Sequence, residues 1–293
     1  MQTKTSPKLW RIVELLQTTT EFLQKKSIDN PRLNAELLLC KVLGIQRVDL
    51  YVNYDRPISS QELQEYRDYI RRRASREPLQ YVLGQTEFMS LTFKVNPSIL
   101  IPRQDTETLV EWVLDRFNGR QNLKILDLGT GSGNIAVSLA YYLNEPQITA
   151  VDISQEALES AQENANLNKV DDCVSFIHCD VLDRRFEIIM NDRFDIIVAN
   201  PPYIQEQEFM QLEPEVREYE PRIALVGQDK VNTFSHRICE LAPHLLKDNG
   251  EVFVEIAAGQ SETVEAIFKK NRFKSVQIRK DIAGIERVVL AKF

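Results

Sequence analysis

The tetrad Asn200-Pro201-Pro202-Tyr203 contains groups that could hold a planar amino group for reaction. The Asn200 side chain has an amide oxygen that accepts hydrogen bonds, and Pro201 has a backbone carbonyl but no N–H. Two consecutive prolines stiffen the chain, so these acceptors are in place before a ligand binds. Tyr203 adds a flat aromatic wall. Together they suit a planar –NH2 group, held by its two hydrogens with the nitrogen lone pair aimed at an electrophile.

Such a nitrogen is a poor nucleophile, because its lone pair is delocalised. Orientation in a near-attack geometry, and acceptors that stabilise the positive charge developing on nitrogen, supply much of the rate. The nitrogen becomes far more acidic once it is alkylated, so neither a strong base nor a metal ion is needed beforehand. We therefore predict Asn200, Pro201 and Tyr203 to be the catalytic residues and expect no metal site.

A glycine-rich turn, Asp-Leu-Gly-Thr-Gly-Ser-Gly at residues 127–133, lies upstream of the tetrad. Glycine lets the backbone approach a ligand closely and adopt a positive φ. Because Asn134 occupies the next position, the spacing is G-x-G-x-G and not the G-x-G-x-x-G of dinucleotide folds. Asp152, at the end of the next predicted strand, supplies an acceptor for ribose hydroxyls. The pattern favours S-adenosylmethionine, which has no phosphate, over a dinucleotide, whose pyrophosphate lies at a helix N-terminus.

A further acidic residue, Asp180, closes the third predicted strand. In this class of fold such a residue lies near the adenine amino group, and Val181 could pack on the ring; a helix cap or turn is nearly as good an explanation of Asp180. The predicted cofactor-binding residues are Asp127, Gly129, Thr130, Gly131, Ser132, Gly133, Asp152, Ile153, Asp180, Val181 and Asn200.

These residues need a scaffold to position them. Beyond Thr106, apolar strands alternate with amphipathic helices, which is typical of an α/β fold with a mostly parallel sheet covered on both faces. The predicted strands are 124–128, 147–152, 174–179, 194–199, 250–256, 275–279 and 286–292, the last two forming an antiparallel finish. The predicted helices are 107–117, 134–143, 155–166, 232–246 and 261–269. The glycine turn and the tetrad thus follow the carboxyl ends of strands, where such sheets bind ligands.

The first 83 residues predict a small helical bundle instead. Apolar residues recur every three to four positions in three segments, at 9–23, 31–43 and 61–76. Two short strands around Asn96-Pro97-Ser98 then predict a hairpin-like connector. We therefore expect a helical domain at 1–83, a β-hairpin connector at 84–104 and an α/β domain at 105–293.

Composition limits the possible functions. The chain has 293 residues, with 36 Lys and Arg against 43 Asp and Glu, a net charge of −7. Residues 1–83 carry a net charge of +4 and the remainder −11, which hints at different partners for the two parts. The 4 cysteines are scattered, which excludes a zinc ribbon and indicates free thiols in a reducing cytoplasm. No apolar stretch approaches the roughly 18 residues of a membrane span, and no apolar signal core precedes Trp10, so we expect a cytoplasmic protein.

The motifs resemble those of the amino-methylating, adenosylmethionine-dependent methyltransferases. More narrowly, the whole chain resembles the release factor glutamine N5-methyltransferases of bacteria and organelles. The matching stretches are residues 80–84, 87–88, 100–103, 127–133, 200–203, 219–222 and 281–289. The element Ile101-Pro102-Arg103 with Glu107 is rather specific to glutamine methyltransferases. Gln104, Asp105 and Ala257 depart from the family's usual Pro, Glu and Gly.

The resemblance implies a Rossmann-like class I methyltransferase domain, with a mostly parallel seven-stranded sheet whose last strand is antiparallel, preceded by a small all-α domain. It implies methyl transfer from S-adenosyl-L-methionine, giving S-adenosyl-L-homocysteine, to the glutamine N5 of the Gly-Gly-Gln loop of class 1 peptide chain release factors. Asn200 and Pro201 would hold the glutamine amide, and Pro202 and Tyr203 would shape its pocket. Phe88 and Arg103 would lie near the mouth of that pocket, or Arg103 would form an ion pair at a domain interface. The helical domain would contact the release factor, and a monomer is expected.

Three alternatives remain open at this stage. The tetrad also fits an adenine amino group, but an adenine-N6 nucleic-acid methyltransferase must neutralise phosphates and flip its base, and the half with charge −11 shows no basic stripe. An enzyme that methylates a glutamine of a ribosomal protein shares the reaction and is harder to exclude. The intact motifs argue against a binding module that keeps only the fold. We expect no stable nucleic-acid partner and no membrane association.

Overall fold

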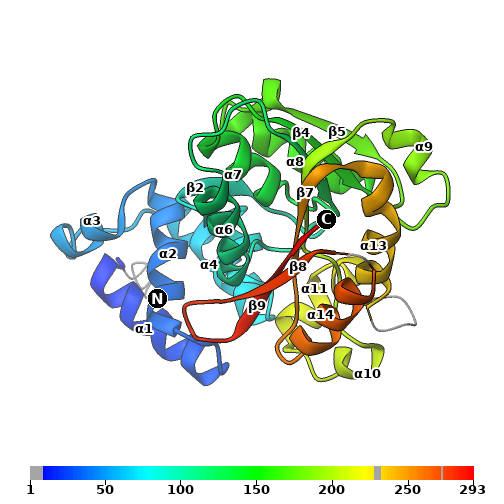
Figure 1. Cartoon of the computed structure of the whole chain (residues 1–293). Coiled ribbons are helices and arrows are strands. Elements are labelled where there is room, and N and C mark those ends of the chain that lie inside the picture. The colour runs from blue at the N-terminus through cyan, green and yellow to red at the C-terminus, as the bar shows by residue number, and fades with distance from the viewer. Residues whose placement is uncertain (1–8, 228–231, 272) are drawn as a thin grey trace, which may run out of the picture. The chain divides into compact units, whose positions relative to one another are not determined.

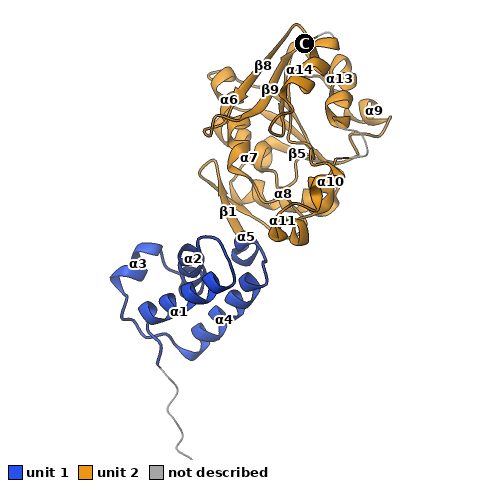
Figure 2. Ribbon diagram, turned by 90° about the horizontal axis from the view of Figure 1, so that it is seen from below, with its two compact units in different colours: residues 1–84 blue, residues 85–293 orange. Residues whose placement is uncertain are grey.

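The computed structural model describes residues 9–227, 232–271 and 273–293. The chain divides into two compact units, residues 1–84 and 85–293, coloured blue and orange in Figure 2. Each unit has a hydrophobic core of its own: the buried core residues of the first unit run from Ile12 to Val82.

The first unit is helical, as its apolar periodicity predicts. Its helices are α1 Ile12–Lys25, α2 Pro31–Leu43, α3 Arg47–Val52, α4 Ser60–Ala74 and α5 Leu79–Leu83. Helix α4 begins with a capping box, in which the Ser59 hydroxyl accepts from the Glu62 N–H at 3.2 Å and the Glu62 carboxylate accepts from the Ser59 N–H at 2.8 Å. Helices α3 and α5 are additions to the three predicted helices.

A β-hairpin follows, but its turn does not lie where the sequence predicts. The strands are β1 Gln85–Phe88 and β2 Leu91–Lys94, so the prediction of a turn around Asn96-Pro97-Ser98 was wrong. The true turn is at Met89 and Ser90, which both adopt positive φ, 49° and 59°, as a tight hairpin turn requires. Neither residue is the Gly or Asn that normally signals such a turn.

The segment around Asn96 forms a local turn instead of a strand connection. The Asn96 side-chain oxygen accepts from the Ser98 N–H at 2.8 Å, a side-chain bond typical of asparagine turns. The hairpin belongs to the second unit, because Asn164 of helix α8 (Gln155–Leu167) accepts from the Lys94 N–H at 2.7 Å and donates to the Lys94 C=O at 3.1 Å.

The second unit is built on a seven-stranded sheet with the order β5-β4-β3-β6-β7-β9-β8. Strands β4, β5, β7, β8 and β9 are labelled in Figure 1. Its strands are β3 Lys124–Leu128, β4 Gln147–Asp152, β5 Val174–His178, β6 Phe194–Ala199, β7 Leu246–Glu255, β8 Ser275–Lys280 and β9 Glu286–Lys292. Strands β3 to β7 pair in parallel, whereas β9 lies antiparallel between β7 and β8. This confirms the predicted mostly parallel sheet with an antiparallel last strand.

Helices cover both faces of this sheet. The long ones are α6 Glu107–Phe117, α7 Asn134–Tyr142, α8, α13 Thr233–Leu245 and α14 Ser261–Lys270, each within one residue of its predicted bounds. Side chains alternate along each strand, so Leu126 and Leu128 enter the core cluster beneath α13 and α14, while Ile125 enters the cluster beneath α6 and α7.

Short helices fill stretches that carried no predicted structure. Helix α9 Phe186–Met190 precedes β6, and α10 Glu206–Phe209, α11 Pro214–Tyr219 and α12 Arg222–Leu225 follow the tetrad. The predicted irregular segment reached to about residue 229, and its end lies outside the described residues. Across the part of the chain that the structure describes, no helix combines the length and apolar character of a membrane span.

Candidate active site

The predicted site residues meet at one edge of the sheet because parallel strands end there together. Leu128, the last residue of β3, pairs with Ala199, the last residue of β6, so the glycine turn and the tetrad lie side by side. Asp152 ends β4 on the other side of β3, and Asp180 follows β5 by two residues. The sheet order therefore sets Asp180, Asp152, the glycine turn and Asn200 in a row.

The glycine turn needs its glycines for two reasons. Gly129, Gly131 and Gly133 have φ of 74°, 54° and 77°, a region that other residues rarely adopt. A Cβ on Gly133 would also lie 3.0 Å from the Cβ of Ala161 in α8, so a side chain there would push the helix away. Asp152 fixes the turn to β4 by accepting the Gly131 N–H at 2.8 Å.

Asp127 supports this turn from within the protein. Its side chain is fully buried, and one oxygen accepts the Thr130 hydroxyl at 2.7 Å, while Oδ1 has no partner among the described residues. Burial raises the pKa of Asp127 to about 7. Asp127 therefore acts on the turn through Thr130 and does not itself line the cleft described next.

The first cleft brings together nine of the eleven residues predicted to bind the cofactor. They are Gly129, Thr130, Gly131, Ser132, Asp152, Ile153, Asp180, Val181 and Asn200. Gly133 and Asp127 are not in its lining. Among the lining residues that the structure describes, Asp152 and Asp180 are the acidic ones and Arg103 is the basic one, and Arg103 is already paired with Glu220. Such a cleft repels phosphate groups and accepts hydroxyls or a cation.

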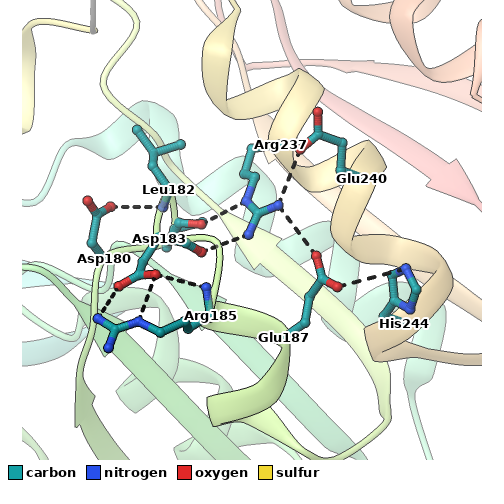
Figure 3. Close-up of polar contacts among 9 residues, drawn as sticks. Asp180, Leu182, Asp183, Arg185, Glu187, Arg237, Glu240 and His244 are labelled. Carbon is teal, nitrogen blue, oxygen red and sulfur yellow. Dashed lines mark hydrogen bonds and ion pairs between the residues drawn. The ribbon is translucent and has the colours of Figure 1, made fainter.

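The loop after β5, which forms one wall of the first cleft, is held by a network of polar contacts (Figure 3). Asp180 accepts the Leu182 N–H at 2.8 Å. Arg237 of α13 donates to the carbonyls of Val181 at 3.0 Å and Asp183 at 2.9 Å. The Arg237 side chain is only 12% exposed, so these are protected bonds.

Carboxylates hold Arg237 in this position. Glu187 and Glu240 accept from its guanidinium at 3.4 and 3.2 Å, and His244 lies 3.8 Å from Glu187 (Figure 3). The cleft wall is therefore positioned by a side chain from a helix more than 50 residues away in sequence.

Asn200, Pro201 and Pro202 of the tetrad line the first cleft, and the residue after the tetrad, Ile204, anchors the chain that follows. Ile204 donates to the Leu225 carbonyl at 3.1 Å and accepts the Gly227 N–H at 3.1 Å, which ties the loop to the segment after α12. Asn200 donates through Nδ2 to the Thr106 hydroxyl at 3.1 Å, so its Oδ1 is the atom directed away from Thr106. This orientation keeps the amide oxygen as an acceptor for a ligand.

Two further clefts meet at the tetrad. The second cleft is lined by Pro201, Pro202, Tyr203, Glu255 and Gln260, and the third by Leu100, Arg103, Asn200, Pro201 and Tyr203, with other residues around them. Burial raises the pKa of Tyr203 to about 12, so its phenol is neutral near pH 7. Pro201 lines all three clefts, so this residue lies where they converge.

Arg103 and Phe88 have different surroundings from one another. Arg103 lines the first and third clefts and pairs with the buried Glu220, which also accepts the Ile101 N–H at 3.1 Å. This ion pair lies within the second unit and is not a contact at a domain interface. Phe88 lines none of these three clefts, because it ends β1 and packs edge-on against Phe93 in the core, at 1% exposure. The structure therefore does not place Phe88 at the mouth of the pocket.

Thr106 and Glu255 are site residues that the sequence did not identify. Glu255 ends β7 at 2% exposure, and burial raises its pKa to about 7. Its signal was an acidic residue at the end of an apolar strand, the same signal that identified Asp152. Thr106 had no such signal, since it lies between two charged residues and reaches the site only through the fold.

A metal centre finds no support in the described residues. Over residues 9–227, 232–271 and 273–293, no three His, Cys, Asp or Glu side chains come together in a way that could hold an ion.

The sheet order, the glycine turn, the acidic strand ends and the tetrad together define an adenosylmethionine-dependent methyltransferase of class I. The crystal structure of the hMettl16 catalytic domain in complex with the MAT2A 3'UTR hairpin 6 has the same fold, with a TM-score of 0.57 and 16% identity over 77% of this chain and 82% of that one. At this identity the likeness shows the fold alone.

Sequence comparisons are more specific. Residues 14–84 match the family described as PrmC N-terminal domain, and residues 104–215 match the Methyltransferase small domain. The release factor glutamine methyltransferase of Geobacter sulfurreducens is 43% identical over 97% of both chains, and that of Chlorobaculum tepidum is 39% identical over 96% of both. The chain belongs to the release factor glutamine methyltransferase family.

Proposed function

We propose that this protein transfers a methyl group from S-adenosyl-L-methionine to the side-chain nitrogen, N5, of the glutamine in the Gly-Gly-Gln loop of class 1 release factors. The observation that carries the chemistry is the orientation of Asn200, whose Nδ2 is engaged by Thr106 while its Oδ1 is left for a ligand beside the first cleft. Near-full-length similarity to release factor glutamine methyltransferases supports the choice of acceptor.

The residues of the first cleft fit S-adenosylmethionine. Asp152 and Asp180 offer acceptors for ribose hydroxyls and an adenine amino group, and Val181 is an apolar neighbour for the ring. Two carboxylates among the lining residues favour a sulfonium cation and disfavour a phosphate. When bound, the cofactor supplies an electrophilic methyl group.

The tetrad would then hold the acceptor amide. Asn200 Oδ1 and the Pro201 carbonyl accept its two hydrogens, which orients the nitrogen lone pair and stabilises the positive charge that develops on nitrogen. The rigidity of the two prolines and the bonds to Ile204 mean that these acceptors need little reorganisation.

The test is a methylation assay with labelled S-adenosylmethionine and three separate acceptors: an intact release factor, a ribosomal protein and duplex DNA. We expect label on the release factor alone, at the glutamine of the Gly-Gly-Gln loop. Asn200→Ala should lower turnover by about 100-fold or more, the scale on which oxyanion-type acceptors act, with cofactor affinity within about twofold. Asn118→Ala, at an exposed asparagine after α6, is the matched control and should behave as wild type.

Two results would contradict the proposal. Label on the ribosomal protein or DNA in place of the release factor would assign a different acceptor. Full turnover by Asn200→Ala would remove the tetrad asparagine from catalysis.

A further inference from the structure

Asn200 can work only if its amide is turned the right way. With Oδ1 toward the acceptor it receives a hydrogen of the substrate –NH2 group, whereas with Nδ2 toward the acceptor two donors would face each other. A threonine hydroxyl alone does not choose between these states, since it both donates and accepts. A group that takes the Thr106 hydrogen is required to fix the orientation.

Glu255 lies where such a group is needed. Val254 of β7 pairs with Ala199 of β6, and Glu255, the last residue of β7, and Asn200, the first residue after β6, come directly after this pair. Thr106 and Asn200 both face the Glu255 carboxyl and lower its pKa, against the burial that raises it. An ionised carboxylate only accepts, so a bond from Thr106 to Glu255 would use the Thr106 hydrogen. That bond would leave a lone pair of the Thr106 hydroxyl oxygen for Asn200 Nδ2, which lies 3.1 Å from this oxygen.

The surroundings of Glu255 do not offset the free-energy cost of burying its carboxylate, so a contribution to stability does not explain this residue. Its Oε2 has no partner in the described structure, and the side chain is 2% exposed. Arg287 of β9 is the cation that faces it, but Arg287 already pairs with Asp281 at 3.1 Å and Asp105 at 3.2 Å. Asp105 adds a like charge. A buried carboxylate in this state lowers stability and marks a functional position.

We propose that Thr106 and Glu255 are positioning residues that engage the side-chain nitrogen of Asn200 and thereby point its oxygen at the methyl acceptor. This rests on the proposed function for the identity of the acceptor and adds two residues from η1 (Gln104–Thr106) and β7 to the two that touch it. Thr106 and Glu255 act through Asn200.

The first test compares Thr106→Val, which keeps the shape but removes the hydroxyl, with Thr106→Ser, which restores it. Thr106→Val should lower kcat by about 10-fold or more, the effect of one lost hydrogen bond in the transition state, with cofactor affinity within about twofold. Thr106→Ser should recover kcat to within about threefold of wild type. Thr108→Val, at the buried threonine that is the second residue of α6, is the matched control and should leave kcat unchanged.

The second test uses pH. The groups that face Glu255 are Thr106 and Asp105 of η1, Asn200 and Tyr203 after β6, and Arg287 of β9. The carboxylate must be ionised to accept, so wild-type kcat should rise with pH through about 7, and Glu255→Gln should lower kcat and remove this inflection. The control is Glu251→Gln. Glu251 is another buried carboxylate of β7 and pairs with Arg116 of α6, so this variant should lose stability but keep the inflection of kcat with pH.

A third readout does not depend on any acceptor. In the free protein labelled with 15N-asparagine, the Asn200 side-chain amide is identified by its absence from the Asn200→Ala spectrum. Its protons should exchange slowly with water in wild type and at least about 10-fold faster in Thr106→Val, because a bonded proton is protected.

These readouts separate the two proposals. If wild type methylates no release factor, the proposed acceptor is wrong, while the exchange measurement still tests the positioning of Asn200. Wild-type kcat in Thr106→Val, a Thr106→Ser variant as impaired as Thr106→Val, or unchanged exchange of the Asn200 amide would each overturn the positioning role.

Discussion

Two buried carboxylates, Asp127 of β3 and Glu255 of β7, lie on either side of the strand that leads into the tetrad. Each has one oxygen without a partner in the described residues, and burial raises the pKa of both to about 7. Burial disfavours the charged form, so the folded protein holds these protons more tightly than the unfolded chain does. The site therefore lowers the stability of its own domain as pH rises.

At the scale of one residue, Asp127→Asn tests this cost. A carboxyl whose folded pKa is raised contributes stability that is present below its unfolded pKa, about 4, and is lost as pH rises through about 7. Asparagine does not ionise, so the melting temperature of Asp127→Asn relative to wild type should increase by a few degrees between pH 5 and pH 8. Thermal unfolding followed by circular dichroism across this range measures the difference.

The control for this prediction is Asp192→Asn. Asp192 is half exposed, and its hydrogen bond from Lys124 lowers its pKa. Its contribution to stability changes only at lower pH, so the shift in melting temperature should be constant from pH 5 to pH 8. A constant shift in Asp127→Asn as well would show that Asp127 is not a destabilising charge.

Individual residues also show which parts of the site can be predicted from the sequence. Asp152 and Asn200 were predictable because each follows an apolar strand directly, and strand ends gather at one edge of a parallel sheet. Thr106 was not, because its position depends on how η1 packs at the site and not on any repeating pattern. Phe88 was expected near the mouth of the pocket from the family resemblance alone, whereas its side chain at the end of β1 packs in the core.

At the scale of the element, the loop after β5 depends on α13. Arg237 donates hydrogen bonds to two carbonyls of this loop, so the loop should become more mobile in Arg237→Met. The variant should bind S-adenosyl-L-homocysteine about 10-fold more weakly, which corresponds to the loss of one or two charged hydrogen bonds. Turnover at saturating cofactor should change much less, because Arg237 does not line any of the three clefts. Isothermal titration calorimetry measures the affinity.

Arg185→Met is the matched variant within the same network. Arg185 is 77% exposed and pairs with the Asp183 carboxylate at 2.8 Å, without reaching the carbonyls that Arg237 holds. Exposed pairs contribute little, so cofactor affinity should stay within about twofold of wild type. Equal affinities for the two variants would mean that the loop keeps its position without α13.

Element prediction succeeded where a pattern is long enough to be periodic. Helices of ten or so residues, such as α6 and α14, carry several apolar residues on one face and were placed to within one residue. Helices α9 and α10, of five and four residues, are too short for a period to appear. The hairpin turn failed differently, since Met89 and Ser90 adopt positive φ without the residues that usually signal it.

At the scale of the whole molecule, chemistry and charge divide between the two units. All three clefts are lined by residues of the second unit, and the part of the chain from residue 84 on carries a charge of −11. The first 83 residues carry +4, and residues 14–84 match the PrmC N-terminal domain family. No described residue of the first unit lines the three clefts. We therefore infer that the first unit recognises the protein substrate and the second performs the transfer.

Removing the first unit should separate these two roles. A chain of residues 85–293 keeps both core clusters of the sheet, so it should bind S-adenosyl-L-homocysteine within about twofold of the full chain. It should methylate a short Gly-Gly-Gln peptide as well as the full chain does, but its kcat/KM for an intact release factor should fall by about 10-fold or more, since docking contacts are lost.

Raising the salt concentration should increase KM for the intact factor in the full chain more than in the shortened one, because screening weakens attraction to basic helices. Equal kcat/KM for both chains on the intact factor would instead place recognition within the second unit.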